Sequence, residues 1–337
     1  MAVKIGIVLP TFYGGAYSDH EPSLARLIQF GREVERLGFD GLWVIEHLVV
    51  APPVYQTAWL EPLTVLSAMA AVTTRVRLGT SILVLPIRTP AILAKTAGTL
   101  DYISGGRVTL GMGVGWWDQE FEVCGIPKKA RGRRMEEHLE VLHTLFAGPN
   151  ATYQGPTYAF RNVTIEPRPI QKPRIPIWIA GGSAAGQAHT VYAPKTEHVL
   201  RRIAKYGDGW ISRAVTSVEL MAKDWAEMLG YAKEFGREAS EFTFAHINFV
   251  FLTSERDTSK DEARQRFSKI SSLPFQDIVA EYMVGTKAEV LDRLDRLVDI
   301  GVRYFILWPT GFDYPLLEFL ANVVLPRYAR VDQTRPT

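Results

Sequence analysis

The chain of 337 residues has little that would assign it to a specialised class of protein. Its single cysteine, Cys124, cannot form an internal disulfide, and no cysteine–histidine cluster has the spacing of zinc ligands. With 38 Lys and Arg against 36 Asp and Glu, the formal charge of +2 is too small to attract nucleic acid or an anionic membrane. No stretch approaches the ~18 apolar residues of a membrane span. The start of the chain lacks the pattern of a signal peptide, so we expect a cytoplasmic protein.

What is present is an ordinary globular composition, with 47% apolar and 22% charged residues. Such a composition excludes a disordered or collagen-like chain. At roughly 150 residues per domain the length allows two domains, but α/β barrels form single domains of about 250 residues or more. The order of the predicted strands and helices therefore has to show whether the chain forms one hydrophobic core or two.

Short apolar runs alternate with longer segments of helical period. Most of the runs are apolar on both faces, which is typical of parallel strands covered by helices. Eight strands are predicted, at Val3–Leu9, Gly41–Glu46, Val76–Leu85, Arg107–Gly113, Ile175–Ala180, Gly209–Ser212, Phe242–Leu252 and Val302–Trp308. Helices are predicted at Glu21–Leu37, Glu61–Thr74, Thr89–Ile103, Arg131–Phe146, Thr196–Lys205, Ser217–Phe235, Lys260–Lys269, Lys287–Ile300 and Pro315–Tyr328.

Eight strands that are each followed by a helix predict an α/β fold, a (β/α)8 TIM-like barrel in which residues 1–337 form one domain. An open, doubly wound parallel sheet is the alternative. Insertions are expected after the fourth and seventh βα units. The first, Gly148–Arg174, is predicted to be a hairpin with strands near Thr157–Arg161 and Val163–Glu166. The second, Ser254–Gly285, is predicted to contain a helix.

In a barrel of this kind, functional side chains follow the C-terminal ends of the strands. Glu46 and His47 follow the second predicted strand. A carboxylate beside an imidazole at this place is suited to hydrogen bonding and to proton transfer near neutral pH. The alternative is a histidine that is satisfied locally, within the enlarged loop Leu48–Trp59.

Glycines mark the ends of the next two strands. Small residues from Gly79 to Ser81 either let a flat ligand approach the backbone or belong to a tightly packed strand. The fourth strand ends in Gly111, Gly113 and Gly115, with Trp116 and Trp117 behind them. This G-x-G-x-G spacing is not the G-x-G-x-x-G of a dinucleotide site. Its backbone N–H groups and large rings indicate a ligand pocket with an aromatic wall.

After the fifth strand, Gly181–Ser183 forms a turn whose successive N–H groups and hydroxyl suit a phosphate, although a bare turn is the alternative. The basic run Lys128–Arg134 is either a binding patch or the solvated start of a helix, with Arg133 and Glu137 as an i,i+4 pair. Together, these strand ends predict a planar cofactor with a phosphate, bound across the barrel mouth.

Several motifs occur in order over about residues 3 to 212. They are Gly79-Thr80-Ser81-Ile82-Leu83-Val84-Leu85-Pro86, Ser104-Gly105-Gly106-Arg107, Gly113-Val114-Gly115-Trp116 through Glu120-Phe121, Pro176-Ile177-Trp178-Ile179-Ala180-Gly181-Gly182 and Gly207-Asp208-Gly209-Trp210. With these motifs the chain resembles the bacterial luciferase-like family, and more narrowly its branch of F420-dependent oxidoreductases.

The resemblance implies a barrel that binds F420, a deazaflavin, or alternatively FMN at its C-terminal face. It implies a cis peptide bond between Ser81 and Ile82 against the cofactor ring. His47 matches the family's frequent active-site histidine, and Glu46 matches an acidic neighbour that contacts the ring. The cofactor-binding residues that we expect are Ser81, Ile82, Gly113, Gly115, Gly181, Gly182 and Ser183.

The chain also departs from the family pattern. Where the family's sugar-phosphate dehydrogenases carry a catalytic glutamate, this chain has Trp116, which argues against a sugar-phosphate substrate and leaves Glu120 as the nearest acid. The loop after the phosphate turn is lengthened by Gly186–Pro194. Together with Trp116, the side chains of Tyr55 and Trp59 predict a pocket for a small, mostly apolar molecule.

Three functions remain open. The first is F420-dependent hydride transfer, with His47 exchanging the accompanying proton. The second is a two-component FMN monooxygenase, supplied by a separate reductase, whose dry pocket would be walled by tryptophans. Those tryptophans are Trp43, Trp59, Trp116 and Trp117. The third is a barrel that binds flavin without turnover. The presence of Glu46 and His47 argues against this third function. The resemblance also implies a homodimer.

Overall fold

The computed structural model describes residues 2–13, 21–51, 57–183, 196–214, 216–254, 257–268, 275–276, 279 and 282–329. Two features expected from the sequence, Tyr55 and the stretch Gly186–Pro194, lie outside these residues. Within the described ranges, no helix has both the length and the apolar character to cross a membrane.

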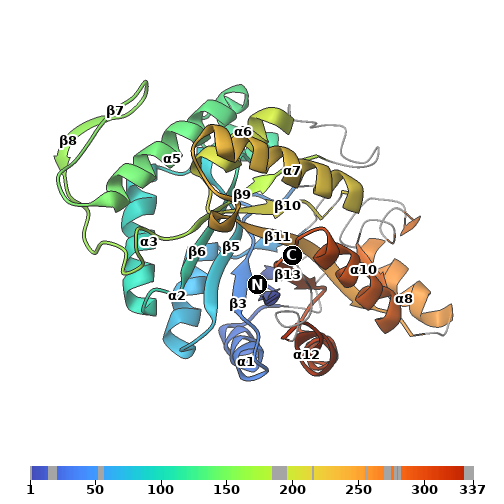
Figure 1. The fold of residues 1–337 in the computed structure, drawn as a ribbon. Helices are drawn as coiled ribbons and strands as arrows, with labels where there is room; N and C mark the ends of the chain where they lie inside the picture. The colour runs from blue at the N-terminus through green and yellow to red at the C-terminus, as the bar shows by residue number, and fades with distance from the viewer. Residues whose placement is uncertain are drawn as a thin grey trace.

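The predicted barrel is confirmed (Figure 1). Parallel strands follow one another in the order β10-β9-β6-β5-β3-β1-β13-β11, and the pairing of β10 with β11 closes the sheet. Each strand falls within, or within one residue of, a predicted one. They are β1 (Lys4–Val8), β3 (Gly41–Val44), β5 (Arg77–Val84), β6 (Val108–Gly113), β9 (Ile177–Gly181), β10 (Gly209–Ser212), β11 (Thr243–Leu252) and β13 (Tyr304–Pro309).

Helices surround the barrel and begin where local chemistry favours a helix start. Ser23 and Ser217 cap two of them through their hydroxyls, and two others carry proline in the first turn. The helices are α1 (Leu24–Arg36), α2 (Pro62–Val72), α3 (Pro90–Ser104), α4 (Asp118–Val123), α5 (Arg131–Ala147), α6 (Thr196–Tyr206), α7 (Val218–Glu234), α8 (Asp257–Ser268), α10 (Lys287–Asp299), α11 (Tyr314–Phe319) and α12 (Leu325–Ala329). A single π-helical turn, Leu320–Val324, joins the last two. Of these helices, the short α4 was not predicted.

The first insertion is a hairpin, as predicted, but its strands lie earlier in the chain. They are β7 (Ala151–Gln154) and β8 (Ala159–Val163), paired antiparallel, and Figure 1 shows them projecting from the body of the barrel. Thr157, predicted to start a strand, lies in the turn instead. Its N–H and that of Tyr158 donate to the Glu137 carboxylate of α5 at 2.6 and 2.9 Å, so they are not available to a partner strand.

The second insertion follows the seventh barrel strand and contains α8, as predicted. It also contains a strand that the sequence pattern did not indicate, β12 (Met283–Gly285). β11 is ten residues long, and β12 pairs with its last residues, from Val250 to Leu252. A further two-stranded sheet joins β2 (Phe12–Tyr13) to β4 (Ala58–Trp59), so that the enlarged loop after β3 returns to the first strand.

The interior of the barrel is filled by large rings rather than left open. Trp43 stacks on Trp178 with ring centroids 5.2 Å apart, and its Nε1–H donates to the Tyr304 hydroxyl at 3.2 Å. Glycines on the flanking strands leave room for it. A Cβ atom on Gly79 would come within 2.4 Å of the Trp43 ring, and one on Gly6 within 2.2 Å. Gly79 therefore has a packing reason, which agrees with the alternative of a tightly packed strand.

Replacing Gly79 with alanine tests this packing. We expect Gly79→Ala to lower the free energy of unfolding by about 1–3 kcal/mol, because the added methyl group overlaps a fully buried ring. Gly230→Ala is the matched control, since nothing lies within 4 Å of a Cβ at this exposed position of α7. It should raise the stability by roughly 0.4–1 kcal/mol. Urea denaturation measures both values, and a neutral Gly79→Ala would contradict the account.

Candidate active site

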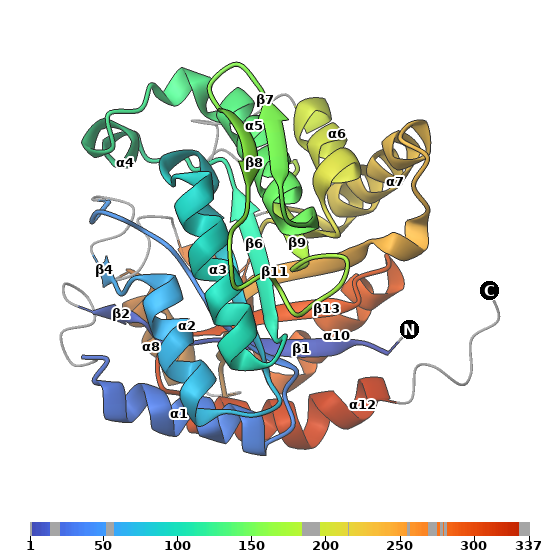
Figure 2. The ribbon, with the colours of Figure 1, turned by 90° about the vertical axis from the view of Figure 1, so that its left-hand side faces the viewer.

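The predicted site residues come from barrel strands that are neighbours in the sheet, β3, β5, β6 and β9. His47 follows β3, Ser81 and Ile82 lie in β5, Gly113 ends β6 and Gly181 ends β9. Because these strands are parallel, their C-terminal ends meet at one edge of the barrel. Figure 2 shows that α4, β2 and β4 gather at this same end.

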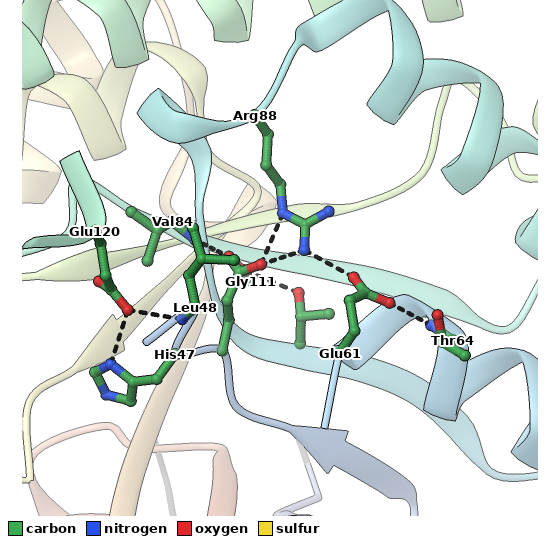
Figure 3. Close-up of polar contacts among 10 residues, drawn as sticks. His47, Leu48, Glu61, Thr64, Val84, Arg88, Gly111 and Glu120 are labelled. Atoms are coloured by element: carbon green, nitrogen blue, oxygen red, sulfur yellow. Dashed lines mark hydrogen bonds and ion pairs between the residues drawn. The ribbon is translucent and has the colours of Figure 1, made fainter. Parts of the chain in front are cut away.

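The centre of the site is a pair formed by His47 and Glu120. His47 Nδ1 lies 3.1 Å from Glu120 Oε1, and the Leu48 N–H donates to the same oxygen at 2.8 Å (Figure 3). The side chains are 9% and 1% exposed. Glu120 reaches this position from α4, 73 residues further along the chain. A buried carboxylate thus holds the orientation of an imidazole at the barrel mouth.

The expected partnership between Glu46 and His47 is not formed. Successive side chains of an extended segment point in opposite directions, so two neighbours at a strand end do not face each other. The carboxylate of Glu46 accepts the Val84 N–H at 2.6 Å and is paired with Arg88. The acid that accompanies His47 is Glu120 instead.

Glu46 belongs to a network that ties β3 to β5 and α2. The Arg88 guanidinium contacts Glu46. It also donates to Glu61 at 2.8 Å (Figure 3). Glu61 in turn accepts the Thr64 N–H at 2.7 Å and caps α2. Burial acts to raise the pKa of Glu61, but the hydrogen bonds from Arg88 and Thr64 hold that pKa below its usual value. These contacts let Glu46 hold the loop in position, and its contact with a cofactor ring stays a prediction.

The floor of the mouth is formed by β5. The peptide bond between Ser81 and Ile82 is cis, as the family resemblance implied. The pairing of β5 with β6 shifts in register between Thr80 and Leu83, so this segment departs from regular strand geometry. Just before the shift, the Thr80 hydroxyl donates to the Gly111 carbonyl at 2.9 Å. The irregular segment places Ser81 and Ile82 at the edge where the strands end.

At two positions of the G-x-G-x-G segment, close packing leaves no room for a side chain. A Cβ on Gly113 would come within 2.5 Å of Ile82 Cδ1, and one on Gly115 would come within 2.5 Å of Val84 Cγ1. Gly115 also has a left-handed backbone, with φ of 73°. These glycines let β5 approach closely and turn the chain toward α4, and thus toward Glu120. Their contact with a cofactor stays a prediction.

The predicted phosphate turn is bound internally by an acid that the sequence analysis did not single out. Ser183 donates its N–H to Asp224 Oδ2 at 2.6 Å and its hydroxyl to Oδ1 at 2.8 Å. Gly181 and Gly182 have φ values of 150° and 106°, which favour glycine. Asp224 is only 2% exposed and lies on the buried face of α7. A charged residue on the apolar face of an amphipathic helix was the signal that could have found it.

Aromatic rings enclose His47. The rings of Trp59 and Trp116 lie 5.6 and 5.9 Å from the imidazole, which agrees with their predicted place in the pocket. Phe12 packs on Trp59 at 5.4 Å because β2 pairs with β4, and Trp308 packs on the other side at 5.6 Å. Neither Phe12 nor Trp308 was predicted, although Trp308 lies near the end of the last strand, where functional residues are expected.

The other predicted wall residues lie elsewhere. Trp43 is buried in the barrel interior and does not reach the mouth. Trp117 packs on Trp116, with centroids 5.3 Å apart. The wall instead continues through Phe249, which stacks on Trp308 at 3.8 Å, and Tyr282 of the second insertion, 4.9 Å from Phe249.

The basic run is largely occupied by structural contacts. Lys128 pairs with Asp118 at 2.6 Å, and the Arg131 guanidinium donates to the Lys128 carbonyl at 3.1 Å. The expected pair of Arg133 with Glu137 is not formed, because the Glu137 carboxylate binds the turn of the hairpin. The interpretation as a helix start is closer to what the structure shows.

Ser81 Oγ and Glu120 Oε2 are among the buried polar atoms of the site that have no hydrogen-bond partner within the described residues. Buried polar atoms in proteins are nearly always paired, so each such atom indicates a position where a ligand or a water completes the site. Both fit a cofactor with hydrogen-bonding edges. No group of His, Cys, Asp and Glu within the described ranges is arranged to hold a metal ion.

The positioning role of Glu46 leads to a stability prediction. Glu46→Gln should lower the free energy of unfolding by about 2–4 kcal/mol, because it leaves the Arg88 charge without its buried partner. The control is Glu61→Gln, which removes the more exposed partner of the same arginine and should cost about 1 kcal/mol or less. Chemical denaturation measures both, and equal losses would contradict the assignment.

Two proteins illustrate what this chain is similar to in sequence. The chain is 27% identical over 350 residues to an F420-dependent glucose-6-phosphate dehydrogenase of Microbacterium testaceum, with 95% of this chain and 98% of that protein covered. Over 153 residues it is 35% identical to an uncharacterised protein of Mycobacterium tuberculosis, covering 45% of this chain. That match spans about half (48%) of the mycobacterial protein's length.

Solved structures share the fold. A monooxygenase from Streptomyces bottropensis superposes with a TM-score of 0.80 at 24% identity, over 96% of this chain and 99% of that one. An F420-dependent secondary alcohol dehydrogenase, in complex with an F420–acetone adduct, superposes with a TM-score of 0.77 at 19% identity, over 96% and 98%. The similar proteins with a named activity are oxidoreductases.

The family model described as luciferase-like monooxygenase matches residues 3–276. This range runs from the first barrel strand into the second insertion and contains His47, Glu120 and the turn at Ser183. The chain therefore belongs to the luciferase-like monooxygenase family.

Proposed function

We propose that the chain is an F420-dependent oxidoreductase that transfers a hydride between the deazaflavin and a small, mostly apolar organic substrate. The observation that supports this most is the buried His47–Glu120 pair, set between Trp59 and Trp116 at the barrel mouth. The full-length similarity to a protein named as F420-dependent supports the choice of cofactor.

The residues that would hold the cofactor lie on β5 and after β9. Ser81 and Ile82 would face the ring system, and the buried hydroxyl of Ser81 offers it a hydrogen bond. The turn Gly181–Ser183 would lie at the phosphate. When bound, the deazaflavin supplies a hydride carrier at C5, which protein side chains do not provide.

The hydrogen bonds of Glu120 determine which nitrogen of His47 is reactive. Since Oε1 already accepts the Leu48 N–H, it acts as an acceptor, and Nδ1 of His47 is the donor in their contact. The carboxylate thus fixes the tautomer with the hydrogen on Nδ1, and Nε2 is the nitrogen that would exchange a proton with the substrate. In substrate oxidation Nε2 takes the hydroxyl proton, and in reduction it returns one.

The surroundings of this histidine favour an apolar substrate. Two indole rings flank it, and Phe12 and Trp308 extend the wall beyond Trp59. Such a wall excludes water, which strengthens the electrostatic interactions inside it. Trp116 stands where the family's sugar-phosphate dehydrogenases carry a catalytic glutamate, so we expect glucose 6-phosphate not to be a substrate.

The alternative is an FMN-dependent, two-component monooxygenase. The same dry aromatic wall supports it, because a reaction with oxygen at a reduced flavin needs exclusion of water. The similarity of fold to the Streptomyces monooxygenase agrees with it. The two proposals differ in the cofactor that binds, and this difference is directly measurable.

Cofactor titration separates the two proposals. We expect the purified chain to bind F420 and to bind FMN much more weakly, with Trp59 and Trp116 reporting binding through quenching of tryptophan fluorescence. Riboflavin serves as a control for unspecific binding of an isoalloxazine ring. Tight binding of FMN without binding of F420 would contradict the proposed function and favour the monooxygenase.

The proton-transfer role predicts the behaviour of two variants, assayed with F420 and a panel of small alcohols, ketones and enones. His47→Ala should lower turnover by about 10²-fold or more while F420 affinity stays nearly unchanged. Glu120→Gln should lower turnover by about 10²- to 10⁴-fold and shift its pH profile, because the amide permits the wrong tautomer. Glu122→Gln, an exposed change on the same helix, is the control. Unchanged turnover in His47→Ala would remove His47 from the mechanism.

A further inference from the structure

Arg213 directly follows β10 at the C-terminal end of the barrel, and it has no assigned role. In the pairing of β10 with β9, Ser212 lies opposite Gly181. Arg213 is the residue after this pair, so it begins close to the predicted phosphate turn. Trp210 packs against the helix layer and Ile211 in the barrel interior, and continuing this alternation past the strand end would turn Arg213 toward the inner side.

The Arg213 side chain is half-buried, yet it makes no hydrogen bond or ion pair with any described residue. Other arginines of the described part that are not exposed donate to a carbonyl, a hydroxyl or a carboxylate. Arg88 contacts Glu46, for example, and the buried Arg202 contacts Glu136. A half-buried guanidinium that donates no hydrogen bond has lost part of its hydration without replacing it, and this indicates an anion that is bound from outside.

Asp224 is near Arg213 but forms no hydrogen bond or ion pair with it. Both carboxylate oxygens of Asp224 are engaged by Ser183, at 2.6 and 2.8 Å, and a Cβ on Gly182 would approach Oδ2 within 2.8 Å. Burial lowers the pKa of Arg213, and the Asp224 carboxylate offsets this only in part. Asp224 therefore fixes the turn, while the donors of the guanidinium stay available to a ligand.

We infer that Arg213 binds the phosphate group of the cofactor, on the side of the Gly181–Ser183 turn that faces the barrel mouth. Arg213 contributes the positive charge, and the planar fork of its N–H groups matches two phosphate oxygens. Asp224 acts as a positioning residue that holds Ser183 and the turn in place. This inference rests on the proposed function only in requiring a cofactor with a phosphate, which F420 and FMN share.

Binding measurements on Arg213→Ala and Arg213→Gln test the inference without a substrate. For each protein, dissociation constants are measured for F420 and for the deazaflavin that ends at its ribityl chain, without the phosphate, and likewise for FMN and riboflavin. We expect both variants to bind the phosphate-bearing cofactor about 10- to 100-fold more weakly and the phosphate-free compound as the unchanged protein does. The salt dependence of binding should decrease as well.

The controls are a conservative change and a distant one. Arg213→Lys should recover part of the affinity, and Arg201→Ala, an exposed arginine of α6 paired with Glu197 and Glu234, should not alter it. Unchanged affinity for the phosphate-bearing cofactor in both Arg213 variants would overturn the inference, and so would equal losses for both members of a pair. If the unchanged chain binds FMN instead of F420, the proposed function is wrong. The comparison of FMN with riboflavin then still tests whether Arg213 binds the phosphate.

Discussion

The buried carboxylate of Glu120 is the contact on which the candidate active site depends. It holds the His47 ring and the Leu48 N–H at one oxygen, and it joins the end of β3 to α4. The position of α4 depends in turn on the left-handed turn at Gly115 after β6. Without this carboxylate, neither the orientation of the imidazole nor its tautomer would be determined. The aromatic wall would then enclose a histidine whose reactive nitrogen is not fixed.

The packing of the barrel determines where a ligand can lie. Trp43, Trp178 and Tyr304 fill the interior, and the glycines of β1 and β5 make room for them. In the proposed arrangement a cofactor would lie at the mouth, above the irregular segment Ser81–Ile82. There the four neighbouring strands β3, β5, β6 and β9 would supply its surroundings, and Arg213, which follows β10, would contact its phosphate. Proton transfer would then take place at one end of this site and charge recognition at the other.

The strands and most helices could be predicted because each is local: buried parallel strands are apolar runs, and amphipathic helices repeat every 3.6 residues. The residue types at the strand ends could also be predicted, and the family motifs indicated the cis bond at Ser81. What could not be predicted is which side chains meet. The pairing of His47 with Glu120, of Glu46 with Arg88 and of Ser183 with Asp224 joins residues far apart in the chain. The six residues of α4 are too few to show a period, and β12 is only three residues long.

A crystal structure of the chain with bound F420 tests the central claim most directly. The account predicts that the deazaflavin ring lies against Ser81 and Ile82, with its reactive face toward the His47 imidazole and with Glu120 still at Nδ1. It predicts the phosphate between the Gly181–Ser183 turn and Arg213. A ring bound away from β5, or a His47 side chain that turns its Nδ1 from Glu120 toward solvent, would contradict the account.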